Sequence, residues 1–331
     1  MLGLIASIYL FLIYFIYRNI FQYVDIEYYL KTIIYLSIIS GFLGIVGWFL
    51  YQISINNILA VEMVFPFYIG KPVRAVALLS TPSLLAFTLI ISLIIFLSFR
   101  RNKIKYFYLK FIILNVALLL TFSKSFVLYI VCLILIFIKK IKSLQLKYLC
   151  ILFIVLLVFL HSILTSFLIL NKEKNSECLE CLDHIAPLQH SEEIYEDSNI
   201  LIYATRYTFL KIKSIAIIKD NYLWGIGYKN FANTKKNEYP FLKDAMPHST
   251  YLGILSEFGI FGLISIILIF LYTLKSSLNS YVYLNTNMSV IVIYLILEGF
   301  HMDIIMFKLI WIIFALIIYL KNHKNSFSKH T

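Results

Sequence analysis

Long apolar runs separated by short charged breaks recur along this sequence from end to end. A helix that crosses a bilayer needs about 20 mostly apolar residues, and many of the runs approach that length. Hydrophobic residues occupy 61% of the 331 positions and charged residues only 14%. A soluble fold would be left with more apolar surface than one core can bury. We therefore predict an all-α fold, a polytopic transmembrane helical bundle for which the bilayer is the solvent.

About nine membrane helices are predicted from these runs. The first run has no Lys or Arg before Arg18, so it lacks the charged start of a cleavable signal peptide and is expected to remain as a span. The predicted spans cover residues 1–17, 32–51, 75–99, 106–122, 126–138, 148–170, 251–274, 282–300 and 304–320. Residues 1–331 are accordingly expected to form a single membrane domain.

The formal net charge of +12 is distributed as a topology signal rather than as a nucleic-acid-binding surface. Residues 171–249 carry 10 Lys and Arg against 11 Asp and Glu, whereas the rest of the chain carries 19 against 6. Basic residues in short breaks between helices mark the cytoplasmic side of a membrane protein. Residues 171–249 are therefore predicted to form a large extracytoplasmic loop between the sixth and seventh helices of a bacterial inner-membrane protein. Nucleic acid is not an expected partner.

The extracytoplasmic loop contains a segment with helical periodicity. Apolar residues recur at helical spacing over residues 200–219, which predicts an amphipathic helix that carries Arg206. The glycine turn at residues 225–227 lacks the strand and helix that a dinucleotide-binding loop requires, so no nucleotide cofactor is expected. Three N-cap candidates precede the predicted helix: Asp197, Ser198 and Asn199.

Two cysteines, Cys178 and Cys181, lie in the predicted loop on the oxidising side of the membrane. Such a compartment permits a disulfide, whereas a thiol pair close to His184 would also suit zinc. These three side chains are one ligand too few for a structural zinc site. The preferred interpretation is therefore a disulfide, or two thiols without a functional role. No metal and no cofactor is expected.

Four cations lie at the predicted outer boundary, where the positive-inside tendency disfavours them: Lys71, Arg74, Lys124 and Arg206. Such charges suit an anion at headgroup depth, and a lipid-linked pyrophosphate is such an anion. Arg binds phosphate through a planar fork of donors, while Lys supplies a point charge. The alternative is that each cation snorkels to lipid headgroups or pairs with a carboxylate such as Glu62. Their shared location favours pyrophosphate binding by Arg74, Arg206 and Lys124.

His248 is the candidate catalytic residue. It precedes Ser249 and Thr250, either of which can cap the seventh membrane helix, so the imidazole is expected at a helix N-terminus. The positive end of a helix favours the neutral ring, which can take the proton of an attacking sugar hydroxyl. The alternative is an interfacial hydrogen-bonding role. Weaker candidates in the same part of the sequence are Glu257, Glu298, His301 and Asp303.

Four stretches of the chain together resemble the O-antigen ligase and O-antigen polymerase family. Residues 247–263 read PHSTYLGILSEFGIFGL, which is similar to the family's His-Asn pair followed by Leu, Glu, Gly and Gly-Leu. The other stretches are Arg206 with NYLWGIG at 221–227, Arg74 with TPS at 81–83, and TFSKS at 121–125. They resemble the family's Arg before Asn-Pro-x-x-Gly-x-Gly, its Arg before an Asn-Pro-Asn-type break, and its Thr-x-Ser-Arg-Ser.

This resemblance implies a metal-independent glycosyltransferase. Family members bind a glycan on undecaprenyl pyrophosphate outside the cytoplasmic membrane and transfer it. By this resemblance His248 is the base, and Arg74 and Arg206 hold the pyrophosphate. Lys124 stands where Arg is usual, which keeps the charge but loses the bidentate fork. Ser249 replaces the usual Asn.

Three functions are compatible with these features. An O-antigen ligase, which transfers the glycan to lipid A-core, is the leading prediction. An O-antigen or surface-polysaccharide polymerase, which uses a growing glycan as acceptor, is the alternative. A lipid-linked oligosaccharide transporter is less favoured, because transport predicts charges along a path through the bilayer. The expected partners are the undecaprenyl-pyrophosphate-linked glycan, its acceptor and membrane lipid.

Overall fold

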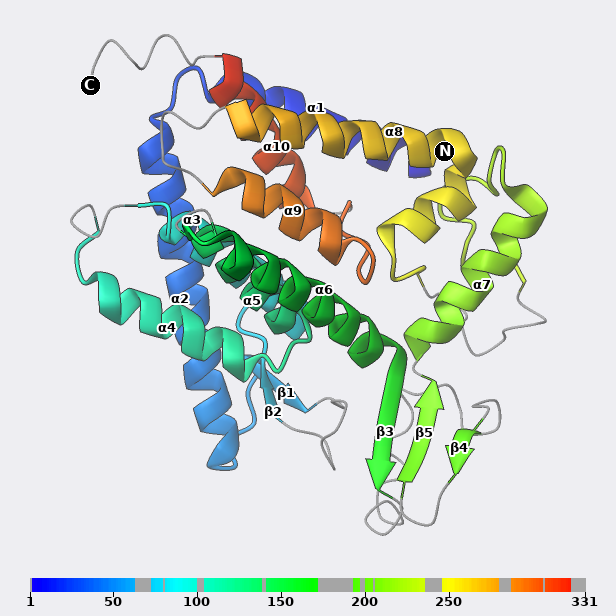
Figure 1. Cartoon of the computed structure of the whole chain (residues 1–331), viewed down its shortest axis with the longest axis horizontal. Helices are drawn as coiled ribbons and strands as arrows, with labels where there is room; N and C mark the ends of the chain where they lie inside the picture. The colour runs from blue at the N-terminus through cyan, green and yellow to red at the C-terminus, as the bar shows by residue number, and fades with distance from the viewer. Residues whose placement is uncertain are drawn as a thin grey trace. The chain divides into compact units, whose positions relative to one another are not determined.

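The structure of the chain is a computed structural model, which describes residues 2–62, 73–79, 81–99, 104–138, 141–171, 193–196, 200–204, 206–235, 246–279, 287–305 and 307–322. These residues form ten helices and five short strands (Figure 1). The helices are α1 (Leu2–Ile20), α2 (Ile26–Gln52), α3 (Pro82–Phe96), α4 (Phe107–Leu120), α5 (Ser125–Ile138), α6 (Leu144–Ser166), α7 (Arg206–Asn221), α8 (Thr250–Asn279), α9 (Met288–Glu298) and α10 (Lys308–Asn322). The strands are β1 (Ala60–Glu62), β2 (Val73–Ala75), β3 (Phe167–Asn171), β4 (Glu193–Glu196) and β5 (Ile200–Ala204).

Each of the nine predicted spans contains a helix, so the prediction of a mainly helical fold is confirmed. In the described residues, three helices are long and apolar enough to cross a membrane: Ile26–Gln52, Leu144–Ile163 and Thr250–Leu278. Shorter apolar helices accompany them: Pro82–Phe96, Phe107–Leu120, Ser125–Ile138 and Met288–Glu298. The number of nine membrane crossings stays a prediction.

The predicted third span, residues 75–99, begins later than its apolar residues suggested. Its first residue is still part of β2, which pairs antiparallel with β1 and places Arg74 opposite Val61. The helix starts only at Pro82, where the Thr81 hydroxyl accepts a hydrogen bond from the Leu84 N–H at 3.3 Å. Proline at the first helical position needs no N–H partner, so this pair fixes the start of α3.

The segment at residues 200–219, predicted as one amphipathic helix, is a strand followed by a helix. β5 pairs antiparallel with β3 and β4, in the order β3-β5-β4. Its branched and aromatic residues favour an extended backbone, and the partner strands satisfy its hydrogen bonds. Only α7, from Arg206 onward, is helical. The fold is therefore mainly helical with two small sheets rather than all-α, and the N-cap candidates at 197–199 lie outside the described residues.

The chain divides into two compact units, which are described separately: Met1–Ile26 with Arg206–Thr331, and Glu27–Thr205. In the unit Glu27–Thr205, α3 packs against both α4 and α5, and α5 packs against α6. Leu85, Leu89 and Ile90 of α3 are completely buried. A helix that is apolar on all sides requires such cover, which explains the central place of α3 in this unit.

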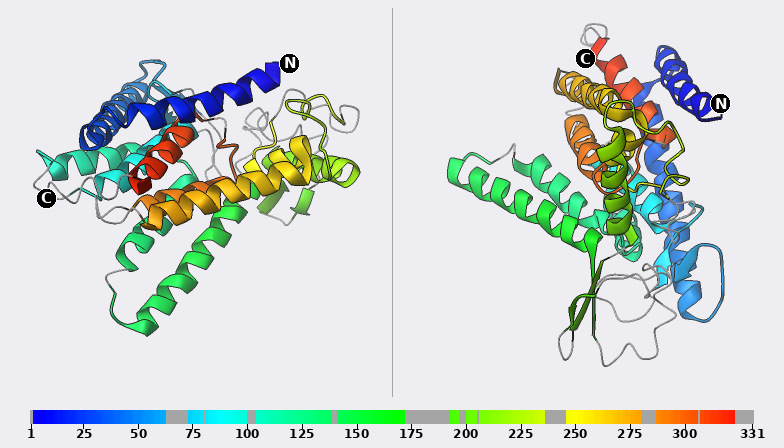
Figure 2. Two further views of the ribbon diagram at one scale, coloured as in Figure 1. Left: turned by 90° about the horizontal axis from the view of Figure 1, so that it is seen from above. Right: turned by 90° about the vertical axis from the view of Figure 1, so that its right-hand side faces the viewer.

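In the other unit, α8 is the helix against which α7, α9 and α10 pack, and α1 packs along α10 (Figure 2). The rings of Phe21 and Tyr319 lie 6.1 Å apart at the α1–α10 contact. α8 bends sharply at Gly259, whose φ of 68° and ψ of −166° are not helical (Figure 1). The backbone groups at this bend take part in the candidate functional site described below.

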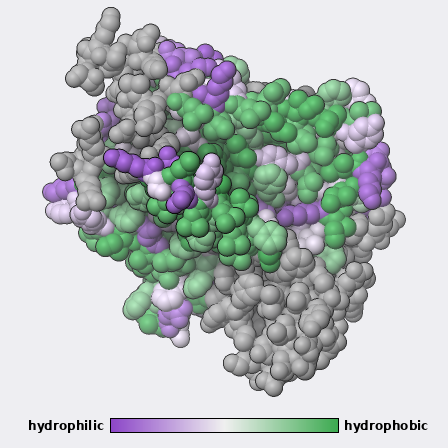
Figure 3. Space-filling view, viewed as in Figure 1, coloured by the Kyte–Doolittle hydropathy of each residue, from purple (hydrophilic) through white to green (hydrophobic). Residues whose placement is uncertain are grey.

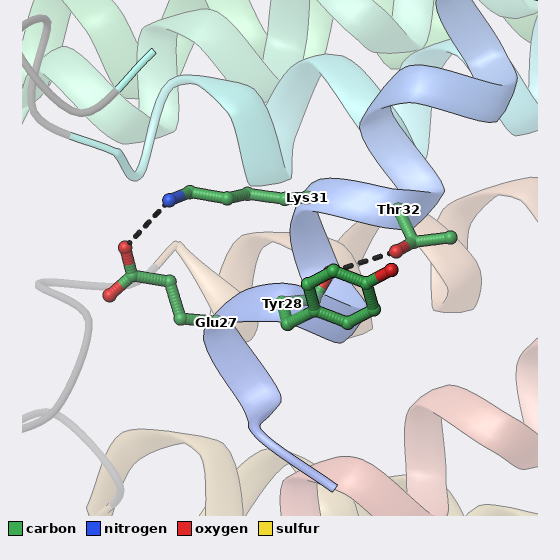
Figure 4. A network of polar contacts seen from close by, with 4 residues as sticks. All are labelled: Glu27, Tyr28, Lys31 and Thr32. Atoms are coloured by element: carbon green, nitrogen blue, oxygen red, sulfur yellow. Dashed lines mark hydrogen bonds and ion pairs between the residues drawn. The ribbon is translucent and has the colours of Figure 1, made fainter.

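The N-terminal end of α2 extends beyond the predicted apolar span, which began at residue 32 (Figure 4). Lys31 and Glu27 form an ion pair of 3.0 Å at i, i+4 spacing, and the Thr32 hydroxyl donates to the Tyr28 carbonyl at 2.9 Å. A carboxylate in the first turn also interacts favourably with the helix dipole. These polar contacts continue the helix past the end of its apolar stretch.

Large hydrophobic side chains lie on the surface of both units (Figure 3). Leu152 and Phe159 of α6 are 67% and 63% exposed, and Leu268 of α8 is 58% exposed. Apolar surface in water costs about 25 cal/mol per Å². A surface of this kind on helices long enough to cross a membrane is expected to contact lipid.

Candidate functional site

The four predicted site residues are divided between the two units. Arg74 and Lys124 lie in the unit Glu27–Thr205, whereas Arg206 and His248 lie in the unit that contains α7 and α8. Each pair is described within its own unit.

Arg74 is held against the break between α4 and α5. Its side chain is buried, and its Nε–H donates a hydrogen bond to the Thr121 carbonyl oxygen at 2.8 Å. The strand pairing of β1 and β2 fixes the backbone from which Arg74 projects. The structure therefore joins two stretches that were singled out separately in the sequence, Arg74 and residues 121–125.

Hydroxyl groups shape the break at residues 121–125. The Thr121 hydroxyl donates to the Leu118 carbonyl at 2.6 Å and accepts from the Ser123 N–H at 3.2 Å. The Ser123 hydroxyl lies 3.3 Å from that of Ser125. Such side chains replace the hydrogen-bond partners that backbone groups lose at helix ends. The Ser and Thr residues of this motif thus have a structural role, which leaves Lys124 as its charged member.

His161 of α6 contacts the same break, which the sequence did not predict. Its Nδ1 lies 3.0 Å from the Lys124 carbonyl oxygen. A carbonyl oxygen only accepts hydrogen bonds, so in this contact Nδ1 carries the proton. A histidine inside an apolar run was the signal available in the sequence, because a buried imidazole needs a polar partner.

His248 lies at the N-terminus of α8, as predicted. Ser249 is the N-cap, since its hydroxyl accepts from the Leu252 N–H at 3.4 Å. The half-buried His248 adopts a left-handed backbone with φ of 50°, and its ring lies 4.5 Å from the Tyr207 ring of α7. The helix dipole at this end favours the neutral imidazole. Tyr207 follows Arg206, the first residue of α7, whose side chain lies outside what the structure describes.

The connection between α9 and α10 is fastened to this end of α8. The Thr250 N–H donates to the Gly299 carbonyl at 2.8 Å, and the Thr250 hydroxyl donates to the Met302 carbonyl at 2.9 Å. The same hydroxyl accepts from the Ile304 N–H at 2.9 Å. Two further candidates, His301 and Asp303, are thereby held beside the start of α8.

Lys211 of α7 reaches this connection, which the sequence also did not predict. Its Nζ lies 3.5 Å from the His301 Nδ1. Burial lowers the pKa of the Lys211 ammonium and raises the pKa of the Asp303 carboxyl to about 6. Both shifts in pKa are those expected when a charged group loses water and gains no opposite charge close to it.

The glycine turn discounted as a nucleotide loop has a structural role in this unit. The bend at Gly259 exposes backbone groups of α8, and the turn supplies hydrogen-bond partners for them. The Ile226 N–H donates to the Ser256 carbonyl at 3.0 Å, and the Gly227 N–H donates to the Glu257 carbonyl at 2.9 Å. In the other direction, the Ile260 N–H donates to the Tyr222 carbonyl at 2.8 Å. We call these contacts between residues 222–227 and 256–260 the glycine clasp. Because the clasp follows the last residue of α7, it fixes α7 against α8.

Two glycines of the clasp have no room for a side chain. A Cβ at Gly225 would lie 2.4 Å from the Glu257 carbonyl oxygen, and a Cβ at Gly259 would lie 2.0 Å from the Leu223 carbonyl oxygen. Both have φ of 68°, a left-handed value that favours glycine. The Glu257 carboxylate strengthens the same region by accepting hydrogen bonds from the backbone of Lys229 and Phe231.

Replacing Gly259 with Ala is expected to lower the free energy of unfolding by about 2–4 kcal/mol, from left-handed strain and overpacking together. The midpoint of thermal unfolding in detergent micelles measures this. Ser265→Ala is the matched control, because Ser265 is exposed on the same helix beyond the bend. Equal midpoints for the two variants would contradict the role given to the clasp.

Within the described residues, no group of three His, Cys, Asp or Glu side chains is placed to hold a metal ion. Cys132 is buried and Cys150 is half-buried. The predicted alternatives for Cys178 and Cys181, with His184, lie outside the described residues.

Comparison with known proteins gives one family. Residues 109–267 match the family model described as O-antigen ligase. This segment includes Lys124, Arg206, His248 and the glycine clasp, whereas Arg74 precedes it. A search of curated proteins found no match. The match confirms the resemblance to the O-antigen ligase and polymerase family that the sequence motifs indicated.

Proposed function

We propose that this chain, whose residues 109–267 match the O-antigen ligase family, moves a glycan from undecaprenyl pyrophosphate to an acceptor hydroxyl on lipid A-core. The observation that carries the proposal is the position of His248. Within the matched segment, this imidazole directly precedes the N-cap of α8 and lies beside Tyr207 of α7.

The proposed reaction is a metal-independent glycosyl transfer. The acceptor hydroxyl oxygen attacks the anomeric carbon of the first sugar while the bond from that carbon to the pyrophosphate oxygen breaks. His248, as the neutral imidazole, takes the proton that the hydroxyl releases. The products are the glycosylated acceptor and undecaprenyl pyrophosphate. The leaving group carries the negative charge that develops, so cations bound to the pyrophosphate stabilise the transition state.

The predicted cations have separate parts in this proposal. Arg74 offers a guanidinium that the Thr121 carbonyl orients through Nε, and such a fork suits a phosphoryl group. Lys124 supplies a point charge from the neighbouring break. Arg206 opens α7, where the helix N-terminus adds its own positive potential.

The proposed setting is the bacterial inner membrane, crossed about nine times, with residues 171–249 on the extracytoplasmic side. The charge distribution and the exposed apolar helices support it. On that side the reaction would meet its lipid-linked donor without cytosolic nucleotides.

An O-antigen or surface-polysaccharide polymerase is the second candidate function, because the same family match is expected of it. Both enzymes would use the same donor and the same base. They differ in the acceptor, which for a polymerase is the growing glycan.

Lipopolysaccharide from a deletion strain distinguishes the two on a gel. A ligase defect leaves lipid A-core without O-chains, while a polymerase defect leaves core that bears a single repeat unit. The intact gene should restore the pattern and the His248→Ala gene should not. An unchanged ladder in the deletion strain would contradict both functions.

A further inference from the structure

Two basic side chains, Lys211 and His301, form a pair in the unit that also contains His248. Lys211 Nζ and His301 Nδ1 are 3.5 Å apart. Lys211 stands one helical turn after Tyr207, so both project from the same side of α7. Tyr207 contacts the His248 ring, and Thr250 holds the connection that carries His301. Three segments distant in sequence thus bring this pair to the end of α8 at which the candidate base lies.

Among the described residues, the Lys211 ammonium is not in an ion pair. The acidic groups on the neighbouring elements are Glu257 of α8, Glu298 of α9 and Asp303 of the connection. Among the described residues, no carboxylate oxygen lies within 4.0 Å of Lys211 Nζ. The Glu257 carboxylate is occupied by backbone N–H groups of the clasp region. A half-buried ammonium whose close contact is an imidazole is a site of positive potential.

The Lys211 ammonium also determines which ligand fits. It presents three N–H donors, and at 3.5 Å from His301 it disfavours a second positive charge on the imidazole. An anionic oxygen placed against both nitrogens reverses this effect, because it accepts hydrogen bonds from the ammonium and from a protonated ring. Phosphoryl oxygens have the charge and the acceptor geometry for this arrangement.

We propose that Lys211 and His301 form an additional anion subsite that binds a phosphoryl oxygen of the lipid-linked donor. The inference rests on the proposed function for the identity of the ligand. In it, Lys211 and His301 are positioning residues: they hold the phosphate group near His248 and take no part in proton transfer. A free anionic headgroup offers similar chemistry, so the test must separate the two sources.

The test uses the full-length protein in phosphatidylcholine nanodiscs and undecaprenyl pyrophosphate as the probe. Lys211→Met keeps the apolar stem and removes the charge, and it is expected to weaken the Kd about 10- to 100-fold, the loss of a charge-assisted hydrogen bond. Lys211→Arg should retain most of the affinity. Lys219→Met, at an exposed position on the same helix, is the matched control and should bind as wild type.

Three comparisons decide the outcome. His301→Gln should also weaken binding, and it replaces Lys211→Met if that variant does not fold. Undecaprenol, which lacks phosphate, should bind every variant equally. Unchanged affinity of Lys211→Met and His301→Gln for the probe would overturn the subsite. Equal loss of affinity for phosphatidylglycerol would assign the pair to lipid headgroups and overturn the donor assignment.

Failure of the subsite and failure of the proposed function give different results. If Lys211→Met binds the probe normally and transfers glycan normally, the subsite is wrong and the transferase stands. If the wild type binds the probe with the predicted dependence on Lys211 but transfers no glycan to any acceptor, the binding site stands and the proposed function is wrong.

Discussion

A His248→Ala variant is expected to bind donor as well as the wild type does and to transfer glycan at least about a hundredfold more slowly. The imidazole lies directly before the N-cap of α8, where the helix dipole favours its neutral form. Without it the attacking hydroxyl has no group to take its proton. The measurement is the initial rate of glycan transfer by purified protein, with donor binding measured separately.

Two variants separate proton transfer from packing at this position. His248→Gln keeps a polar side chain but accepts no proton at neutral pH, so it should be as slow as His248→Ala. Tyr207→Phe keeps the ring that lies 4.5 Å from the His248 ring and should transfer at close to the wild-type rate. A full transfer rate in His248→Ala would remove the assignment of His248 as the base.

Arg74→Lys is expected to weaken donor binding about 10- to 100-fold although the positive charge is kept. Arg74 is buried, and its Nε–H donates to the Thr121 carbonyl at 2.8 Å. Lysine has no N–H at that place in the side chain, so the carbonyl loses its donor and the charge loses its orientation. The measurement is the Kd for undecaprenyl pyrophosphate in nanodiscs.

The control for this substitution is Arg18→Lys, at an exposed position on α1. It makes the same chemical change and should leave the Kd unaltered. The unfolding midpoint of Arg74→Lys should also be recorded, because an unsatisfied buried carbonyl costs about 1–3 kcal/mol. Equal donor affinity in the Arg74 and Arg18 variants would show that Arg74 has only a structural role.

The helices of this fold could be predicted because apolar length is a local property of the sequence. Every predicted span contains a helix, and two of the errors lie at helix ends that polar groups determine. Thr81 and Pro82 delay the start of α3, while the Glu27–Lys31 pair extends α2 beyond its apolar run. β5 was missed because its partner β3 lies in an earlier apolar run, and strand pairing is not visible in periodicity.

The candidate site was only partly predictable, for a related reason. His248 could be placed at the N-terminus of a helix because Ser249, its cap, is the next residue. The contact of Arg74 with Thr121 and that of Lys211 with His301 join residues far apart in the chain, and composition gives no sign of either. Such contacts follow from packing of whole helices rather than from any local pattern.

The glycine turn of the clasp was recognised in the sequence, but its structural partner was not. Residues 225–227 were discounted as a nucleotide loop, and their partner in the structure, the bend at Gly259, lies in a helix that reads as continuous in the sequence. Only the left-handed backbone of Gly225 and Gly259, and the absence of space at each, explains why glycine occupies both positions.

Glycan transfer by the purified chain is the decisive measurement for the proposed function. Wild-type protein in liposomes would be given an undecaprenyl-pyrophosphate-linked glycan and lipid A-core on both sides of the membrane. We expect glycosylated lipid A-core and an equal amount of undecaprenyl pyrophosphate, with neither formed by His248→Ala. Absence of any glycosylated acceptor from the wild type, or equal product from both proteins, would contradict the proposed function.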